Sequence, residues 1–73
     1  MTQTREEIKI SLEAARVNAK LSQQEIAEVL GVGRMTIGRW ENGKNFPTTQ
    51  QFVEMCKIYK IHSDYIFLPI KST

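Results

Sequence analysis

The sequence predicts an all-α domain of five short helices around one core. Apolar residues recur at steps of three and four along most of the chain, good capping residues precede the candidate helices, and glycine or proline follows several of them. The 73 residues leave room for one domain with a modest core. We therefore expect a single domain over residues 1–73, with its core in 5–68 and flexible ends at 1–4 and 71–73.

The first helix is expected to run from about Arg5 to Asn18, with Thr4 as its N-cap. Four apolar residues at steps of four, three and four would form its core stripe: Ile8, Leu12, Ala15 and Ala19. The polar side carries Lys9, Glu13 and Arg16, and a surface ion pair of Glu13 with Arg16 or Lys9 contributes only about 0.2–0.5 kcal/mol. We assign this pair no function.

Two short helices joined by a tight turn are predicted between Leu21 and Glu41. Ser22 is a good N-cap, and Glu25 three residues later completes a capping box. The Gly31-Val32-Gly33 segment ends this helix, because glycine enters the left-handed conformation without a Cβ clash. The next helix should begin near Arg34.

Helix 34–41 has one face for packing and another that is free. Ile37 and Trp40 lie three residues apart, so both should point toward the neighbouring helices. A buried tryptophan needs only one partner for its indole N–H, which favours a core role for Trp40 over a platform for base stacking. The remaining positions fall elsewhere around the helix: Arg34, Thr36, Gly38 and Arg39.

The segment from Leu21 to Pro47 carries the ordered motif L-S-Q-x-x-I-A-x-x-x-G-V-x-x-x-x-I-G-x-W-E-x-G-x-x-x-P. This motif resembles the Cro/phage-repressor family of DNA-binding domains. The resemblance implies a lambda-repressor-like fold in which helices two and three form a helix-turn-helix. It also implies sequence-specific binding of double-stranded DNA.

The resemblance places the start of helix 34–41 in the major groove, where each base pair has its own pattern of donors and acceptors. Arg34 and Arg39 are the best candidates for base reading, because arginine can donate two hydrogen bonds to guanine. Thr36 can contact a base through its hydroxyl or its methyl group, and Met35 can contact a thymine methyl group. Core packing remains an alternative for Met35, and a phosphate or carboxylate contact for Arg39.

Phosphate contacts are expected at two places. Gln23 lies in the first turn of its helix, where the free backbone N–H groups also point outward, although a solvent-facing glutamine is the alternative. The turn after helix 34–41 offers a second anchor, formed by Asn42, Lys44 and Asn45. Together these contacts would position the domain on DNA without reading sequence.

The net charge of +2 does not by itself predict a nucleic-acid partner. Its distribution is more informative, because Arg34, Arg39 and Lys44 stand against Glu41 alone within residues 34–44. A solvated face that happens to be basic is the alternative explanation for so short a stretch.

A fourth helix is expected from about Thr49 to Tyr59, after Pro47. Its core stripe would consist of Phe52, Val53, Cys56 and Tyr59. Met55 and Ile58 lie off that stripe and are candidates for an interface, whereas Phe46 should fold back on the core. A short fifth helix should follow Ser63 as its N-cap.

The stretch from Tyr65 to Ile70 is the most apolar part of the chain. In the family that the motif resembles, the fifth helix commonly pairs two subunits, which implies a homodimer and a near-palindromic operator with reading helices about 34 Å apart. The candidate dimer residues are Tyr65, Phe67, Leu68 and Ile70. The alternative is that this tail covers only its own core.

No catalytic, metal-binding or cofactor site is expected. Cys56 is the only cysteine and fits a core position, and His62 has no second ligand at metal-binding spacing, so a capping or surface role is expected. No apolar run approaches the length of a membrane span, and no signal peptide is present. We expect a cytoplasmic protein with no membrane partner and no small-molecule ligand.

These observations predict a sequence-specific DNA-binding transcriptional regulator, a repressor of phage or mobile-element type, and not an enzyme. The alternative is an antitoxin or co-regulator adaptor whose main partner is another protein. A stand-alone short regulator and the excised N-terminal domain of a longer one both fit the length.

Overall fold

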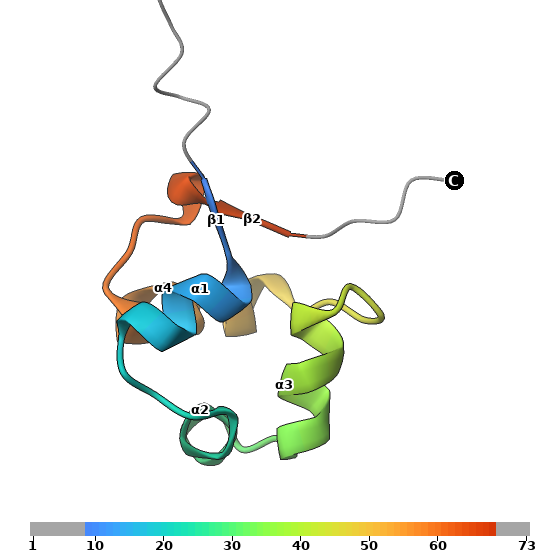
Figure 1. The fold of residues 1–73 in the computed structure, drawn as a ribbon. Helices are drawn as coiled ribbons and strands as arrows, with labels where there is room; N and C mark the ends of the chain where they lie inside the picture. The colour runs from blue at the N-terminus through green and yellow to red at the C-terminus, as the bar shows by residue number, and fades with distance from the viewer. Residues whose placement is uncertain (1–8, 69–73) are drawn as a thin grey trace, which may run out of the picture.

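The computed structural model describes residues 9–68, which form a mostly helical domain. Its elements are β1 (Ile10–Ser11), α1 (Leu12–Asn18), α2 (Gln23–Leu30), α3 (Arg34–Glu41), α4 (Thr49–Tyr59), a 3₁₀ helix (Ser63–Tyr65) and β2 (Ile66–Phe67). In Figure 1 the two strands lie on one side of the helices, and α2 lies on the opposite side. The mostly helical architecture agrees with the sequence prediction.

Side-chain caps explain where three of the helices begin. Ser22 accepts a hydrogen bond from the backbone N–H of Glu25, whose carboxylate accepts one in return from the Ser22 N–H, as the sequence predicted. Thr48 and Gln51 form a second box of this kind at the start of α4. Ser11 caps α1 by accepting from Ala14 at 3.0 Å. These bonds satisfy backbone groups that a helix cannot pair by itself.

Each of the four α-helices in residues 9–68 is followed, within two residues, by a residue with a left-handed backbone. The residues are Lys20 (φ 65°), Gly31 (φ 73°), Gly43 (φ 77°) and Lys60 (φ 58°). After each one, the next backbone N–H donates to a carbonyl five residues earlier, as from Val32 to Ala27 at 3.0 Å and from Ile61 to Cys56 at 3.1 Å. This is the Schellman pattern, for which glycine is the easiest residue.

The first helix begins later than predicted. Within the described residues, Ile10 and Ser11 form a strand that pairs in parallel with Ile66 and Phe67, so the helix starts at Leu12. The prediction from Arg5 was wrong at residues 9–11, because pairing with the C-terminal segment replaces local helical preference there. The predicted cap Thr4 and the core residue Ile8 lie outside the described residues.

The core contains Leu12, Ala15, Ile26, Ala27, Ile37, Trp40, Met55, Cys56, Tyr59 and Ile66. Three sequence predictions about it were wrong. Met55 is fully buried and not at an interface, whereas Val53 is 43% exposed and Phe46 is 44% exposed. On α4 the buried stripe is centred on Met55 and Tyr59, which turns Val53 outward. Ile58, the other interface candidate, is partly buried against this core.

The C-terminal end of the described chain contains one turn of 3₁₀ helix, so a fifth α-helix is not confirmed. The turn is capped by His62, for which a capping or surface role was expected; its Nδ1 accepts from the Asp64 N–H at 3.1 Å. The predicted cap Ser63 is instead the first residue of the turn. The chain then extends into β2, where Ile66 is buried and Phe67 is exposed. The 3₁₀ turn thus covers the start of the predicted fifth helix, and extended backbone follows it at Ile66 and Phe67.

Candidate nucleic-acid interface

The α2–α3 unit presents one side of α3 to solvent. Gly31 adopts the left-handed conformation that ends α2, and Gly33 caps α3 with extended backbone and no side-chain bond. On the inner side of α3, Ile37 and Trp40 are buried, as the sequence predicted. The inner side therefore fixes the helix, and the outer side is free for contact.

Four candidate base-reading residues lie on α3. Arg34 and Arg39 are exposed, and Thr36 is partly buried. Met35 is 66% exposed, which excludes the alternative that it packs in the core. Two arginines, a flexible thioether and a hydroxyl together offer both hydrogen-bond donors and an apolar contact to the edges of bases.

The turn after α3 carries the second group of candidates. Asn42, Lys44 and Asn45 are all exposed. The backbone there is held by hydrogen bonds from the N–H groups of Lys44 and Asn45 to the carbonyl of Arg39, at 2.8 and 3.4 Å. The turn is thus closed on the C-terminal end of α3, the end that carries Arg39.

The outer face of α2 has the opposite charge from α3. Glu25 and Glu28 are exposed there, and Glu28 accepts a hydrogen bond from Gln24 at 2.9 Å. No basic residue occurs in Gln23–Leu30. The candidate phosphate contact on α2 is at its N-terminal end, where backbone N–H groups are unpaired and the carboxylate of Glu25 in the same turn accepts from the Ser22 N–H.

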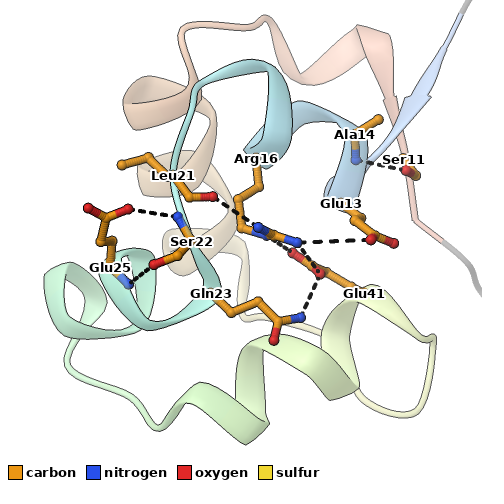
Figure 2. Close-up of polar contacts among 9 residues, drawn as sticks. All are labelled: Ser11, Glu13, Ala14, Arg16, Leu21, Ser22, Gln23, Glu25 and Glu41. Carbon is orange, nitrogen blue, oxygen red and sulfur yellow. Dashed lines mark hydrogen bonds and ion pairs between the residues drawn. The ribbon is translucent and has the colours of Figure 1, made fainter.

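Gln23 lies at that N-terminal end and is partly buried. Its side-chain Nε2 donates to Oε1 of Glu41, the last residue of α3, at 3.0 Å (Figure 2). Gly38 of α3 lies close by, since a Cβ built there would be 3.8 Å from the same Nε2. Gln23 therefore joins the two helices of the motif, a contact that the sequence analysis did not predict.

Glu41 is held from the other side by Arg16 of α1. Arg16 Nε donates to Glu41 Oε2 at 2.7 Å, and Arg16 Nη2 donates to Oε1 at 3.3 Å. A third donor, Arg16 Nη1, bonds the backbone carbonyl of Leu21 at 2.9 Å. Figure 2 shows the guanidinium at the centre of these contacts. One side chain thus links α1, the turn before α2 and the end of α3.

This ion pair is buried, with the Glu41 side chain 3% exposed and the Arg16 side chain 11% exposed. The hydrogen bond to Glu41 raises the pKa of Arg16 further, against the opposing effect of burial. The predicted partner Glu13 lies 4.0 Å away and is largely exposed. The prediction of Arg16 as a surface residue was wrong, since its main partner is Glu41.

The sequence did contain a signal for this pair. Arg16 lies four residues after the core residue Leu12, and Glu41 lies four residues after the core residue Ile37. Both charges therefore border the apolar stripe of their helices, where an unpaired charge is costly. Two opposite charges in such positions are candidates for a buried pair.

The candidate dimer residues have different environments. Tyr65 and Phe67 are exposed, whereas Leu68 is partly buried against the core of its own chain. Ile70 lies outside the described residues. An exposed apolar surface at this end is therefore limited to the two aromatic side chains within residues 9–68.

Within residues 9–68, no helix combines the length and the hydropathy that crossing a membrane requires. That part of the chain also has no group of three or more side chains suited to hold a metal ion.

Comparison with known proteins identifies the family. A family model described as helix-turn-helix matches residues 12–66. The HTH-type transcriptional activator BcrR of Enterococcus faecalis is 32% identical over 53 residues, which cover 73% of this chain but only 26% of that protein. No solved structure matches the chain significantly. The resemblance noted from the motif is confirmed, and the chain belongs to the helix-turn-helix family of the Cro/phage-repressor type.

Proposed function

We propose that this protein is a sequence-specific regulator of transcription that reads the major groove of double-stranded DNA with α3. The observation that carries the proposal is the division of α3 into two sides. Ile37 and Trp40 fix one side in the core, and Arg34, Met35 and Arg39 are exposed on the other. Rigidly held donors are what base recognition needs.

Phosphate contacts would come from both ends of the motif. Gln23 at the start of α2 and the turn of Asn42, Lys44 and Asn45 after α3 lie on either side of the reading helix in sequence. Hydrogen bonds to phosphate set the register of a protein on DNA, and only base contacts distinguish sequences. These roles make separate predictions for each group of residues.

The proposed assembly on DNA is a homodimer on a near-palindromic operator. The exposed Tyr65 and Phe67 support a contact between copies at this end, and the strand pair lies away from α2 (Figure 1). Leu68 and Ile70 complete the proposed interface. Changing Tyr65 and Phe67 to serine together should lower the sedimentation mass at equal concentration; an unchanged mass would remove them from the interface.

Repression is the proposed mode of control, as expected for a regulator of phage or mobile-element type in the cytoplasm. The relative from Enterococcus faecalis is named an activator, so the sign of control needs its own measurement. A reporter gene with the selected operator placed at its promoter distinguishes the two: transcription should fall when the protein is present, and a rise would reverse the assignment.

Selection from a random duplex library is the direct test of the function. A winning sequence with two related half-sites about one helical turn apart is expected. Arg39→Ala should then relax the preference at one base pair, whereas Lys44→Ala should weaken every duplex alike and reduce the salt dependence. Lys57→Ala, on the exposed side of α4, is the matched control. If no sequence is enriched, the alternative function is favoured, that of an antitoxin or co-regulator adaptor whose main partner is another protein.

A further inference from the structure

Met35 presents its thioether to solvent on the outer side of α3. It is 66% exposed, more than any other large apolar side chain in residues 9–68. The other methionine of that range, Met55, is 0% exposed, and Met1 lies outside the described residues. Methionine sulfur is open to oxidation, and access decides which sulfur reacts. A dissolved oxidant therefore reaches Met35 and not Met55 while the chain is folded.

The thiol of Cys56 does not compete for the oxidant. Cys56 is 8% exposed, and burial raises the pKa of its thiol. The reactive form of cysteine is the thiolate, of which little is present at neutral pH when the pKa is raised. The chain has no second cysteine with which Cys56 could form an internal disulfide. A low dose of oxidant is therefore directed to Met35.

The oxidation itself is the transfer of one oxygen atom from a hydroperoxide. The O–O bond of the peroxide breaks and an S–O bond forms, so the sulfur loses two electrons and the peroxide is reduced to the alcohol, or to water if it is hydrogen peroxide. The product is methionine sulfoxide, which is polar and which dedicated reductases convert back to methionine. Its oxygen accepts hydrogen bonds, whereas a thioether sulfur is only a weak acceptor.

The polar product would change two of the candidate base-reading side chains. The expected partner of Met35 is a thymine methyl group, an apolar contact that a sulfoxide loses. Arg39 is exposed and follows Met35 at the spacing of neighbours on one helix face. The sulfoxide oxygen can accept a hydrogen bond from the Arg39 guanidinium and so compete with a base for it. Because Met35 takes no part in the core, the fold should not change.

We propose that Met35 is a reversible oxidation site through which a hydroperoxide weakens the binding of DNA. This inference rests on the proposed reading role of α3 and adds a means of regulation to it. The oxidised chain should stay folded and should bind the selected duplex at least about fourfold more weakly, which is the factor for losing one buried apolar carbon.

Mass spectrometry after treatment with hydrogen peroxide tests the chemical step without DNA. In the folded chain, digestion should locate the added oxygen on Met35, while Met55 should gain one only when urea unfolds the chain before treatment. Circular dichroism should be the same before and after treatment of the folded chain. If both residues were oxidised at the same rate in the folded chain, or if Met35 stayed reduced while free methionine was consumed, the proposal would be overturned.

Fluorescence anisotropy with the selected duplex tests the effect on binding. Peroxide should weaken binding by the parent chain, and methionine sulfoxide reductases with dithiothreitol should restore it. Dithiothreitol alone should not, because it reduces oxidised cysteine but not a sulfoxide. Cys56→Ala should respond to peroxide as the parent chain does. Met35→Leu is the matched variant without the thioether, and its affinity, whatever its level, should be the same before and after treatment.

The outcomes distinguish this inference from the function on which it rests. If the untreated chain prefers no duplex, the proposed function fails and the inference fails with it. If the untreated chain reads the selected duplex and the chain with oxidised Met35 binds it equally well, only the inference is overturned. A loss of affinity that persists in Met35→Leu, or that dithiothreitol alone reverses, would assign the effect to another group and would also overturn it.

Discussion

The two sides of this domain are held together by different kinds of interaction. On the side of the helix-turn-helix, Arg16 joins α1, the start of α2 and the end of α3 through directional hydrogen bonds. On the side of the C-terminal tail, α4 and β2 are held by buried apolar groups such as Met55 and Ile66. The polar network thus lies where helices approach the proposed DNA surface.

The difference between the two sides has a physical reason. Apolar burial is roughly proportional to area and has no preferred direction, so it brings elements together without fixing their orientation. Hydrogen bonds between charged groups have short distances and defined angles. We infer that the polar network serves the relative orientation of α2 and α3, and that the apolar contacts provide most of the stability.

The largest effect should come from breaking the buried pair on one side only. Arg16→Met leaves the Glu41 carboxylate buried without its cation, which should lower the free energy of unfolding by about 3–5 kcal/mol. Urea denaturation measures the loss. Because a domain of this size has little stability to spare, the variant should be partly unfolded at room temperature.

The double variant Arg16→Met/Glu41→Leu sharpens this result. Removing both charges removes the desolvation cost as well, so much of the lost stability should return. If the single change cost less than about 1 kcal/mol, the pair would be behaving as an exposed one. The two sides of the domain would then not differ in the way described.

On the tail side, Met55→Ala should lower the free energy of unfolding by about 2–5 kcal/mol, because it leaves a cavity in the core. Val53→Ala, two residues earlier on the same helix, should change it by no more than about 0.5 kcal/mol. Thermal or urea unfolding compares them directly. Equal effects of the two changes would mean that α4 packs with a different face inward.

The pair Met55 and Val53 also indicates how far the sequence could predict this fold. The helix α4 was predicted with its bounds, because Thr48 is a local capping signal. Its buried face was assigned wrongly, because Phe52, Cys56 and Tyr59 fit a stripe that includes either Met55 or Val53. Whether Met55 or Val53 is buried depends on where the neighbouring helices lie, and the spacing of apolar residues within α4 does not determine that.

For the candidate site too, the sequence could predict the local features but not the contacts between distant residues. The turn at Gly31 and the exposed face of α3 follow from capping and helical spacing, so they could be predicted. The bond from Arg16 to Glu41 joins residues that are 25 positions apart, and the parallel pairing of Ile10 with Ile66 joins the two ends of the domain. Such contacts depend on the assembled fold, and local periodicity does not determine them.

High pH should destabilise the protein through Tyr59, which lies where the two sides meet. Burial raises its pKa to about 12, with a smaller contribution from the Glu41 charge. An unfolded tyrosine loses its proton near pH 10, so between about pH 10 and 12 the unfolded state binds fewer protons than the folded state. The free energy of unfolding should therefore fall as pH rises through this window, by about 2–3 kcal/mol in total.

Urea unfolding at several alkaline pH values measures this dependence. Tyr59→Phe should flatten it, and should also stabilise the protein at neutral pH, because the buried hydroxyl has no hydrogen-bond partner in the described part of the chain. Tyr65→Phe removes an exposed hydroxyl and should leave the dependence in place. An unchanged slope in Tyr59→Phe would assign the alkaline loss to other groups.

The smallest predicted effect concerns the helix ends. The helices of the motif, α2 and α3, end at the glycines Gly31 and Gly43, whereas α1 and α4 end at the lysines Lys20 and Lys60 in the same left-handed conformation. A side chain in that conformation costs about 1–2 kcal/mol. Lys60→Gly removes this cost, but it also gives the unfolded chain more freedom and removes a favourable charge at the helix end.

On balance, Lys60→Gly should raise the free energy of unfolding by about 0.5 kcal/mol, visible as a small rise in the urea midpoint. Lys57→Gly, in the last turn of α4, is the matched control. It should instead lower the free energy of unfolding by up to about 1 kcal/mol, because that residue is helical and glycine has a low helix propensity. Opposite signs for two lysines three residues apart would locate the strain at the helix end. If both changes lower the free energy of unfolding, the charge of Lys60 stabilises the protein by more than its left-handed backbone destabilises it.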